Sequence, residues 1–354
     1  MHWAPILVVL FVTVLSGCGQ AGPPEKVFER LLERVSNVTE VPLNPLERTE
    51  PLPSYPRPRD LVLPLDDMRV GFFTYLGLGR CGLVGEVSAR NSSLGKLQAP
   101  TSRLLYERRF LYQLKNCIQD LQQSNEAKQK KFLTEVQSIA NQKAASLPVV
   151  FWNATFGSPE FRILLSTRSE ALPIQSRSSA TELVSALRFI SAQGRELQSV
   201  QDSKEQSILE SKYYILQSSK LVGQLLQGMV VTTEYMQQGS ELLETVAEQR
   251  KICPMGRKTV KGDYFFNVFQ KFYIGEAQPY MSLIHTQARL LVEAIDELVK
   301  EQKVEIPDAF QSFYNHTLNP GSDSSAWSKF NKALSRHTIA WQSALKQCDL
   351  MPKI

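Results

Sequence analysis

Residues 208–247 read ILESKYYILQSSKLVGQLLQGMVVTTEYMQQGSELLETVA, and this stretch decides the fold class. Apolar side chains stand at every seventh position, namely Ile208, Ile215, Val222, Met229, Met236 and Leu243. Mostly small residues follow each of them four positions later. Such a pattern is typical of long helices that pack closely side by side. It predicts one long helix, about 65 Å in length if it runs unbroken over about 45 residues.

Helical spacing continues on both sides of this stretch. On the N-terminal side, two apolar stripes predict a helical hairpin that begins near Thr101; they comprise Leu104, Leu111, Leu114, Ile118 and Leu121, then Phe132, Val136, Ile139 and Ala140. The run 147–152, LPVVFW, contains a proline and is predicted to be an irregular buried connection. Ser179 and Glu182 have the spacing of a capping box that opens a helix. A break is expected at Gly275 and Pro279.

The segment 42–64 is rich in proline, with Pro42, Pro45, Pro51, Pro53, Pro56, Pro58 and Pro64. Prolines at this density exclude a helix or a central strand, and the leucines between them favour an extended segment that wraps the body. A short helix over 25–36 precedes it. The sequence therefore predicts an all-α protein, an elongated bundle of long antiparallel helices with an extended Pro-rich N-terminal segment. We expect a single helical-bundle domain over residues 65–354.

An apolar run covers residues 4–15. It is too short to span a bilayer, which needs roughly 20 residues, but has the length of a signal-peptide core. Ser16 and Gly17 supply the small side chains that precede a signal-peptidase cut, and Cys18 follows. Leu15-Ser16-Gly17-Cys18 resembles the lipobox of bacterial lipoproteins.

The resemblance to bacterial lipoproteins implies a signal peptide over residues 1–17 and acylation of Cys18 by fatty chains. Residues 18–64 would then comprise the lipid anchor, the short helix and the Pro-rich segment. The membrane becomes a partner through this anchor, since more than one acyl chain gives stable attachment. Because Gly19 rather than an aspartate follows Cys18, the resemblance implies an outer-membrane protein that faces the periplasm.

Four cysteines remain besides Cys18, and an even number in an exported chain predicts two disulfides. Sequence allows three pairings. We favour Cys81–Cys117 with Cys253–Cys348, because each joins neighbouring segments of one half of the chain. The cysteine and histidine spacings do not match a metal site, and no cofactor motif is convincing: the GLGRCG string at 77–82 lacks the strand-to-helix context that dinucleotide binding needs.

The formal net charge of +5 is concentrated in one region. Residues 57–115 contain ten basic and five acidic side chains, so they account for the whole excess. On a tethered protein this region would face an anionic envelope polymer, anionic headgroups or another envelope protein. Nucleic acid is not an expected partner of an exported chain.

One loop carries a candidate catalytic pattern. Ser93 and Lys96 have the S-x-x-K spacing of serine acyl-transfer enzymes. The candidate functional loop is Arg90, Asn91, Ser92, Ser93 and Lys96. The companion motifs of that enzyme class are absent; the nearest match to S-D-N is the string SDS at 322–324. No catalytic residue is assigned.

The lipobox, together with the region from Cys81 to Cys117 and the string RNSSLG at 90–95, resembles an uncharacterised family of Gram-negative lipoproteins of about this length. That resemblance implies no activity. The first hypothesis is a non-enzymatic envelope interaction or assembly role, and the second a cell-envelope hydrolase or transferase that uses residues 90–96. The third is a eukaryotic secreted glycoprotein, suggested by sequons at Asn37, Asn91, Asn153 and Asn315.

Overall fold

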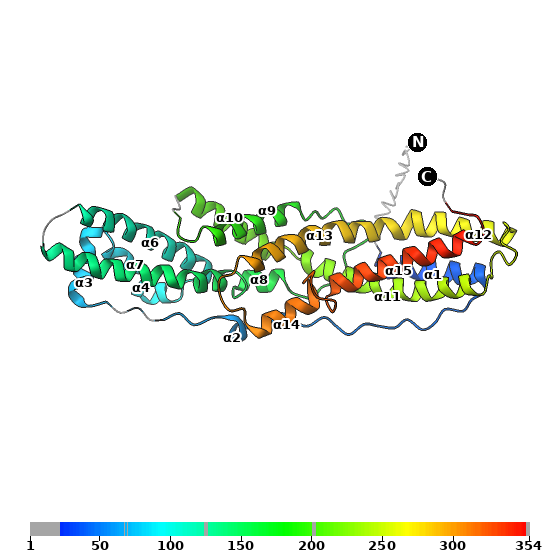
Figure 1. Ribbon diagram of the computed structural model, residues 1–354, viewed down its shortest axis with the longest axis horizontal. Coiled ribbons are helices and arrows are strands. Elements are labelled where there is room, and N and C mark those ends of the chain that lie inside the picture. Colours follow the sequence, from blue (N-terminus) through cyan, green and yellow to red (C-terminus); the bar gives the residue numbers. More distant parts are fainter. Residues whose placement is uncertain (1–21, 67, 69, 124–126, 200–202, 352–354) are drawn as a thin grey trace, which may run out of the picture.

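The computed structural model describes residues 22–66, 68, 70–123, 127–199 and 203–351. These residues contain helices and connecting segments and no strand, so the chain is all-α as predicted. Figure 1 shows an elongated molecule in which the longest helices lie along the long axis. Cys18 and the leader lie outside the described residues. Within the described part of the chain, no helix is both long enough and apolar enough to cross a membrane.

One half of the molecule is a bundle around α11 (Leu221–Glu248). α15 (Ala326–Lys346), α13 (Gln278–Lys300) and α1 (Glu25–Thr39) pack on α11, and α12 (Val260–Val268) and the π-helix η2 (Phe269–Ala277) pack on α1. One close approach is at Gly239, where an added Cβ would lie 2.7 Å from His337 Cε1 and 2.9 Å from Leu32 Cδ2. A residue without a side chain therefore lets α1, α11 and α15 meet.

The direction of these helices differs from the prediction in one respect. Gln347 donates a hydrogen bond to the carbonyl of Ala247, and Cys253 and Cys348, just beyond the ends of α11 and α15, form a disulfide. Hence α11 and α15 run parallel rather than antiparallel. The chain returns through α12, η2 and α13 before it starts α15, which is why the two helices are not a hairpin (Figure 1).

The other half is the predicted hairpin, formed by α6 (Pro100–Gln122) and α7 (Ala127–Ala154). Four short elements lie against it: α3 (Phe72–Gly77), the 3₁₀ turn η1 (Leu78–Cys81), α4 (Val84–Asn91) and α5 (Ser93–Lys96). The Cys81–Cys117 disulfide joins η1 to α6. Both disulfides have the predicted pairing. Between the halves lie α8 (Pro159–Leu164), α9 (Thr181–Arg195), α10 (Ser203–Ser218) and α14 (Asp308–Thr317).

The Pro-rich segment runs outside the bundle from α1 to α2 (Pro58–Leu61) and on towards α3 (Figure 1). The exclusion of any helix from residues 42–64 is therefore wrong for one turn, because Pro58 stands at the first helical position, where a proline is tolerated. We call residues 40–57 the strap. Glu234 of α11, 4 % exposed, accepts three hydrogen bonds from it: Arg48 Nη1 at 2.8 Å, Thr49 N at 2.8 Å and Thr49 Oγ1 at 3.0 Å. Tyr55 donates to the carbonyl of Phe156 at 2.7 Å. Side-chain partners thus replace the backbone partners that an extended, proline-rich segment lacks.

Three local predictions are wrong. The stretch that begins at Ile208 is not one helix, since α10 ends at Ser218 and α11 begins at Leu221. Residues 147–152 are not an irregular connection, because α7 continues through Pro148 to Ala154. The helix after Ser179 starts one residue later than a capping box requires: Ala180 is the N-cap, and its N–H donates to Gln287 Oε1 at 2.6 Å.

The expected break at Gly275 and Pro279 is also absent. Both residues lie within the continuous helical path of η2 and α13.

Candidate functional site

The candidate functional loop is not a loop in the structure but the junction of α4 and α5. Ser92 is the N-cap of α5: its Oγ accepts from Gly95 N at 3.0 Å and donates to Ala89 O at 2.7 Å. Arg90 Nη1 donates to the carbonyl of Gly95. Gly95 is buried so tightly that an added Cβ would lie 2.1 Å from Ala89 O. These contacts fix the angle between the two short helices.

A cavity of about 530 Å³ opens beside this junction, between α4, α5, α6, α7 and the residues Pro64, Leu65, Asp66 and Met68. We call it the basic pocket. Its charged lining residues are the cations Arg90, Lys96, Arg103 and Lys143 and the carboxylates Asp66 and Glu107. Among the described lining residues, four cations against two carboxylates leave an excess of two formal positive charges. Of the predicted loop residues, Arg90, Asn91 and Lys96 line the pocket, whereas Ser92 and Ser93 do not.

Glu107 is the buried centre of the pocket wall, with 2 % of its surface exposed. Lys143 Nζ lies 2.6 Å from Glu107 Oε2, and Arg103 Nε lies 3.5 Å from Glu107 Oε1. The ammonium of Lys143 also lies over the rings of Tyr106 and Phe110, at 5.9 and 5.4 Å from their centroids. One carboxylate therefore neutralises two cations only in part, and the aromatic rings also stabilise the positive charge of Lys143.

Two cations of the pocket are less well compensated. Burial lowers the pKa of the Arg103 guanidinium, and the nearby charge of Arg90 lowers it further, in opposition to Glu107. The Nε of Arg103 is buried without a hydrogen-bond acceptor. Lys96 is exposed and has no ion pair with any residue that the structure describes. A site with this balance attracts anions.

The charge excess distinguishes this pocket from a larger cavity of about 680 Å³ between α2, α7 and residues 303–308. That cavity is lined by two cations and three carboxylates, namely Arg59, Lys303, Asp60, Glu305 and Asp308. Its lining carries no positive excess, so volume alone does not make it the better anion site.

The acyl-transfer hypothesis finds no catalytic set around Ser93. This residue is exposed at the first position of α5, and no hydrogen bond joins it to Lys96 in the described structure. The three histidines that the structure describes lie on other helices: His285 stacks on Trp327 with centroids 5.5 Å apart, His316 contacts the carbonyl of Ser312, and His337 is buried. Among the described residues, no cluster of His, Cys, Asp and Glu could hold a metal ion.

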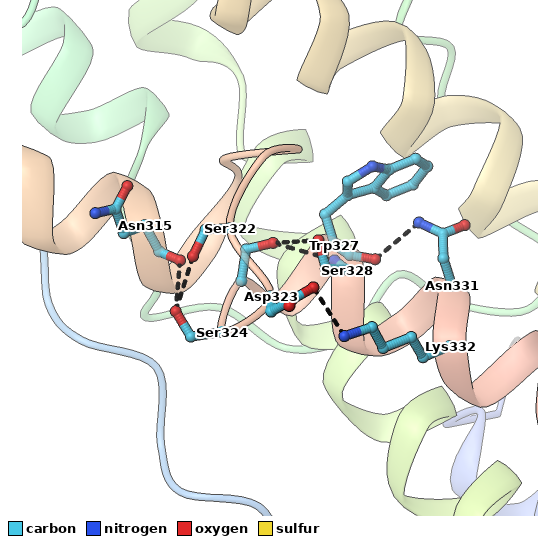
Figure 2. Close-up of polar contacts among 9 residues, drawn as sticks. Asn315, Ser322, Asp323, Ser324, Trp327, Ser328, Asn331 and Lys332 are labelled. Carbon is cyan, nitrogen blue, oxygen red and sulfur yellow. Dashed lines mark hydrogen bonds and ion pairs between the residues drawn. The ribbon is translucent and has the colours of Figure 1, made fainter.

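The SDS string at 322–324 lies in the turn just before Ser325, the N-cap of α15, and Figure 2 shows its polar contacts. Ser322 and Ser324 share a hydrogen bond of 2.9 Å between their hydroxyls, and Ser324 donates to the carbonyl of Asn315. Asp323 pairs with Lys332 at 2.8 Å. Ser325 Oγ accepts from Ser328 N and caps α15. The hydroxyls are used to turn the chain from α14 into α15.

One of the four sequons is excluded from modification in the folded chain. Asn153 is 7 % exposed, and both ends of its amide are bonded to the backbone of Leu63, at 2.8 Å each. A glycan on Asn153 Nδ2 would break this pairing.

The sequence missed Arg103, Glu107 and Lys143 as members of one site. A signal was present for Glu107, which falls three and four residues from Leu104 and Leu111 on the apolar stripe of α6. A carboxylate on a buried stripe needs a cationic partner. Nothing in the sequence identifies that partner as Lys143, 36 residues further on.

Comparison with known proteins places the chain without assigning an activity. Curated proteins and solved structures give no match. Residues 28–352 match the family model of a protein of unknown function, DUF3080, which covers nearly all the described helices. The chain therefore belongs to the DUF3080 family of proteins of unknown function.

Proposed function

We propose that this protein is a lipid-anchored component of the cell envelope, held at the outer membrane through Cys18 and facing the periplasm. In this proposal its helical body binds an anionic envelope component in the basic pocket and catalyses no reaction. The partner is an anionic envelope polymer or an envelope protein that presents carboxylates or phosphates. The observation that carries the proposal is the excess of positive charge around one 530 Å³ cavity.

The arrangement suits binding better than catalysis. An anion that enters the pocket would meet the guanidinium of Arg103 and the exposed ammonium of Lys96. Arg103 is only partly neutralised, because Glu107 pairs with both Arg103 and Lys143. Charge-assisted hydrogen bonds to such groups each contribute about 1.5–3 kcal/mol. In contrast, the nucleophile that the acyl-transfer hypothesis requires does not line the cavity.

The test is to titrate lipopolysaccharide, or solubilised peptidoglycan fragments, into the purified protein by calorimetry at low ionic strength. Lys96→Gln removes a cation that has no ion pair among the described residues, and it leaves Glu107 untouched, so we expect the Kd to rise about tenfold or more. Lys131→Gln is the matched control, because Lys131 is an exposed lysine on α7 outside the pocket lining. Equal affinities of wild type and Lys96→Gln for both probes would refute the proposal.

A second comparison separates binding from catalysis. In a deletion strain, Ser93→Ala should complement as well as the wild type, because Ser93 contributes nothing to the pocket. Lys96→Gln should complement poorly. Loss of complementation with Ser93→Ala alone would favour the hydrolase or transferase hypothesis instead.

A further inference from the structure

A second cationic surface lies at the far end of the molecule from the basic pocket, in the connection from α11 to α12 and the first turn of α12 (Figure 1). We call residues 249–264 the basic loop. It contains five cations, Arg250, Lys251, Arg257, Lys258 and Lys261, and one carboxylate, Asp263. Lys258 pairs with Asp263 at 2.7 Å and Lys261 with Glu40 at 3.1 Å. The other three cations have no ion pair within the described residues.

Large apolar side chains are exposed among these charges. Met255 is 86 % exposed, Val260 69 % and Tyr264 60 %. Val260 and Tyr264 are four residues apart in α12 and so lie on the same face of the helix. Exposed apolar groups interleaved with cations are the composition of an element that lies at a headgroup–acyl boundary.

The basic loop is held in one conformation by its own contacts. The Cys253–Cys348 disulfide fixes its centre to the end of α15. Thr259 Oγ1 donates to Ile252 O at 2.9 Å and accepts from Gly262 N at 3.0 Å. Gly256, with φ of +67°, allows the turn between them. A preorganised surface loses little conformational entropy on binding.

We infer that the basic loop docks on the surface of an anionic phospholipid bilayer. Charge complementarity favours an anionic surface, and the exposed side chains of Met255, Val260 and Tyr264 favour a lipid surface over a purely polar polyanion, because they gain by burial at the headgroup boundary. This inference depends neither on the basic pocket nor on acylation of Cys18.

The experiment measures depth at one residue of the full chain. Tyr264→Trp places an indole in the basic loop, and Tyr214→Trp places one at a tyrosine of similar exposure, 65 %, on α10. Each variant is mixed with brominated-lipid vesicles of phosphatidylcholine alone or with phosphatidylglycerol. Quenching is read after subtraction of the wild-type signal, which arises from the native tryptophans. Any other attachment of the chain to the vesicle affects both variants equally. The ratio of quenching in Tyr264→Trp to quenching in Tyr214→Trp therefore reports docking of the basic loop.

We expect stronger quenching for Tyr264→Trp than for Tyr214→Trp in the anionic vesicles only. Adding Lys251→Gln and Arg257→Gln should lower the docked-to-undocked ratio about 30-fold, since two cations are removed from the surface. Adding Arg168→Gln and Arg177→Gln, two exposed arginines elsewhere, should leave it unchanged. Equal quenching of the two indoles in anionic vesicles would overturn the inference. So would quenching of Tyr264→Trp that is unchanged when the anionic lipid is left out or when the loop cations are replaced.

Discussion

The pH dependence of folding stability should be dominated near pH 5 by His337, which lies in the core of α15 and is fully buried. Burial lowers the pKa of this imidazole to about 3. Trp341 Nε1 donates to His337 Nε2 at 2.9 Å, so the ring must be neutral at that nitrogen to accept the bond. Protonation would both break this bond and place a charge among the rings of Tyr273 and Trp341.

The sign and size of the pH effect on the free energy of unfolding follow from the difference in the His337 pKa between the folded and unfolded states. The pKa in the fold is lower than the value of about 6.5 in the unfolded chain, so protons bind preferentially to the unfolded state. The stabilisation is therefore complete above pH 6.5 and is lost as the pH falls. At pH 5 the loss from this one group is about 2 kcal/mol relative to pH 7.5, at 1.36 kcal/mol per pKa unit. The figure hardly changes for any pKa in the fold of about 4 or below.

The assay is urea unfolding of the wild type and of His337→Gln at pH 7.5 and pH 5.0. Glutamine can still accept from Trp341 but does not titrate in this range. The variant is expected to be less stable overall, so the quantity to compare is the change between the two pH values, which should be about 2 kcal/mol smaller in the variant. His316→Gln, at an exposed histidine, is the control and should behave as wild type. An equal pH dependence in wild type and His337→Gln would refute the reasoning.

Three further predictions concern the strap, the pairing of Asn153 with Leu63, and the disulfides. Glu234→Gln weakens the acceptor that holds the strap and should cost about 1–3 kcal/mol, with faster proteolysis within residues 40–57; an unchanged cleavage rate would contradict the assigned role. Asn153→Ala leaves both backbone groups of Leu63 unpaired and should cost about 2 kcal/mol or more in urea unfolding; a neutral effect would contradict this pairing. Replacing Cys253 and Cys348 by serine opens a crosslink that spans 95 positions and should cost about 4–5 kcal/mol, more than loss of the other disulfide, which spans 36; the reverse order would contradict the loop-entropy argument.

The fold class was predictable because the seven-residue repeat is carried by side chains that are buried in α11: Val222, Met229, Met236 and Leu243. The break before Leu221 was not, since it depends on a local contact: Ser219 Oγ accepts from Leu221 N at 3.2 Å, in the turn between α10 and α11. Ile208, upstream of the break, is 43 % exposed and takes no part in the repeat's packing.

Tertiary packing overrode local propensity in α7. A proline in LPVVFW argues against a helix, yet Leu147, Val150, Phe151 and Trp152 are each at most 1 % exposed. Burial of so many large side chains on a helical segment outweighs the hydrogen bond that Pro148 cannot make. Sequence patterns record the missing donor but not the surface against which the helix packs.

The candidate site was predictable only in the part that is local in sequence. Arg90, Asn91 and Lys96 belong to one short segment, and they do share a wall of the basic pocket. The opposite wall comes from the α6–α7 hairpin, whose register sets which side chains face α5. That register is decided by packing between helices, so the pairing of Glu107 with Lys143 emerges only in three dimensions.

The proposal of an envelope protein is tested most directly at its membrane anchor. Intact-mass spectrometry of the protein isolated from its native membrane should give a chain that begins at Cys18 and carries a diacylglyceryl group and an N-terminal acyl chain. A product that begins at Met1, or a Cys18 without acyl chains, would contradict the proposed localisation and with it the envelope role.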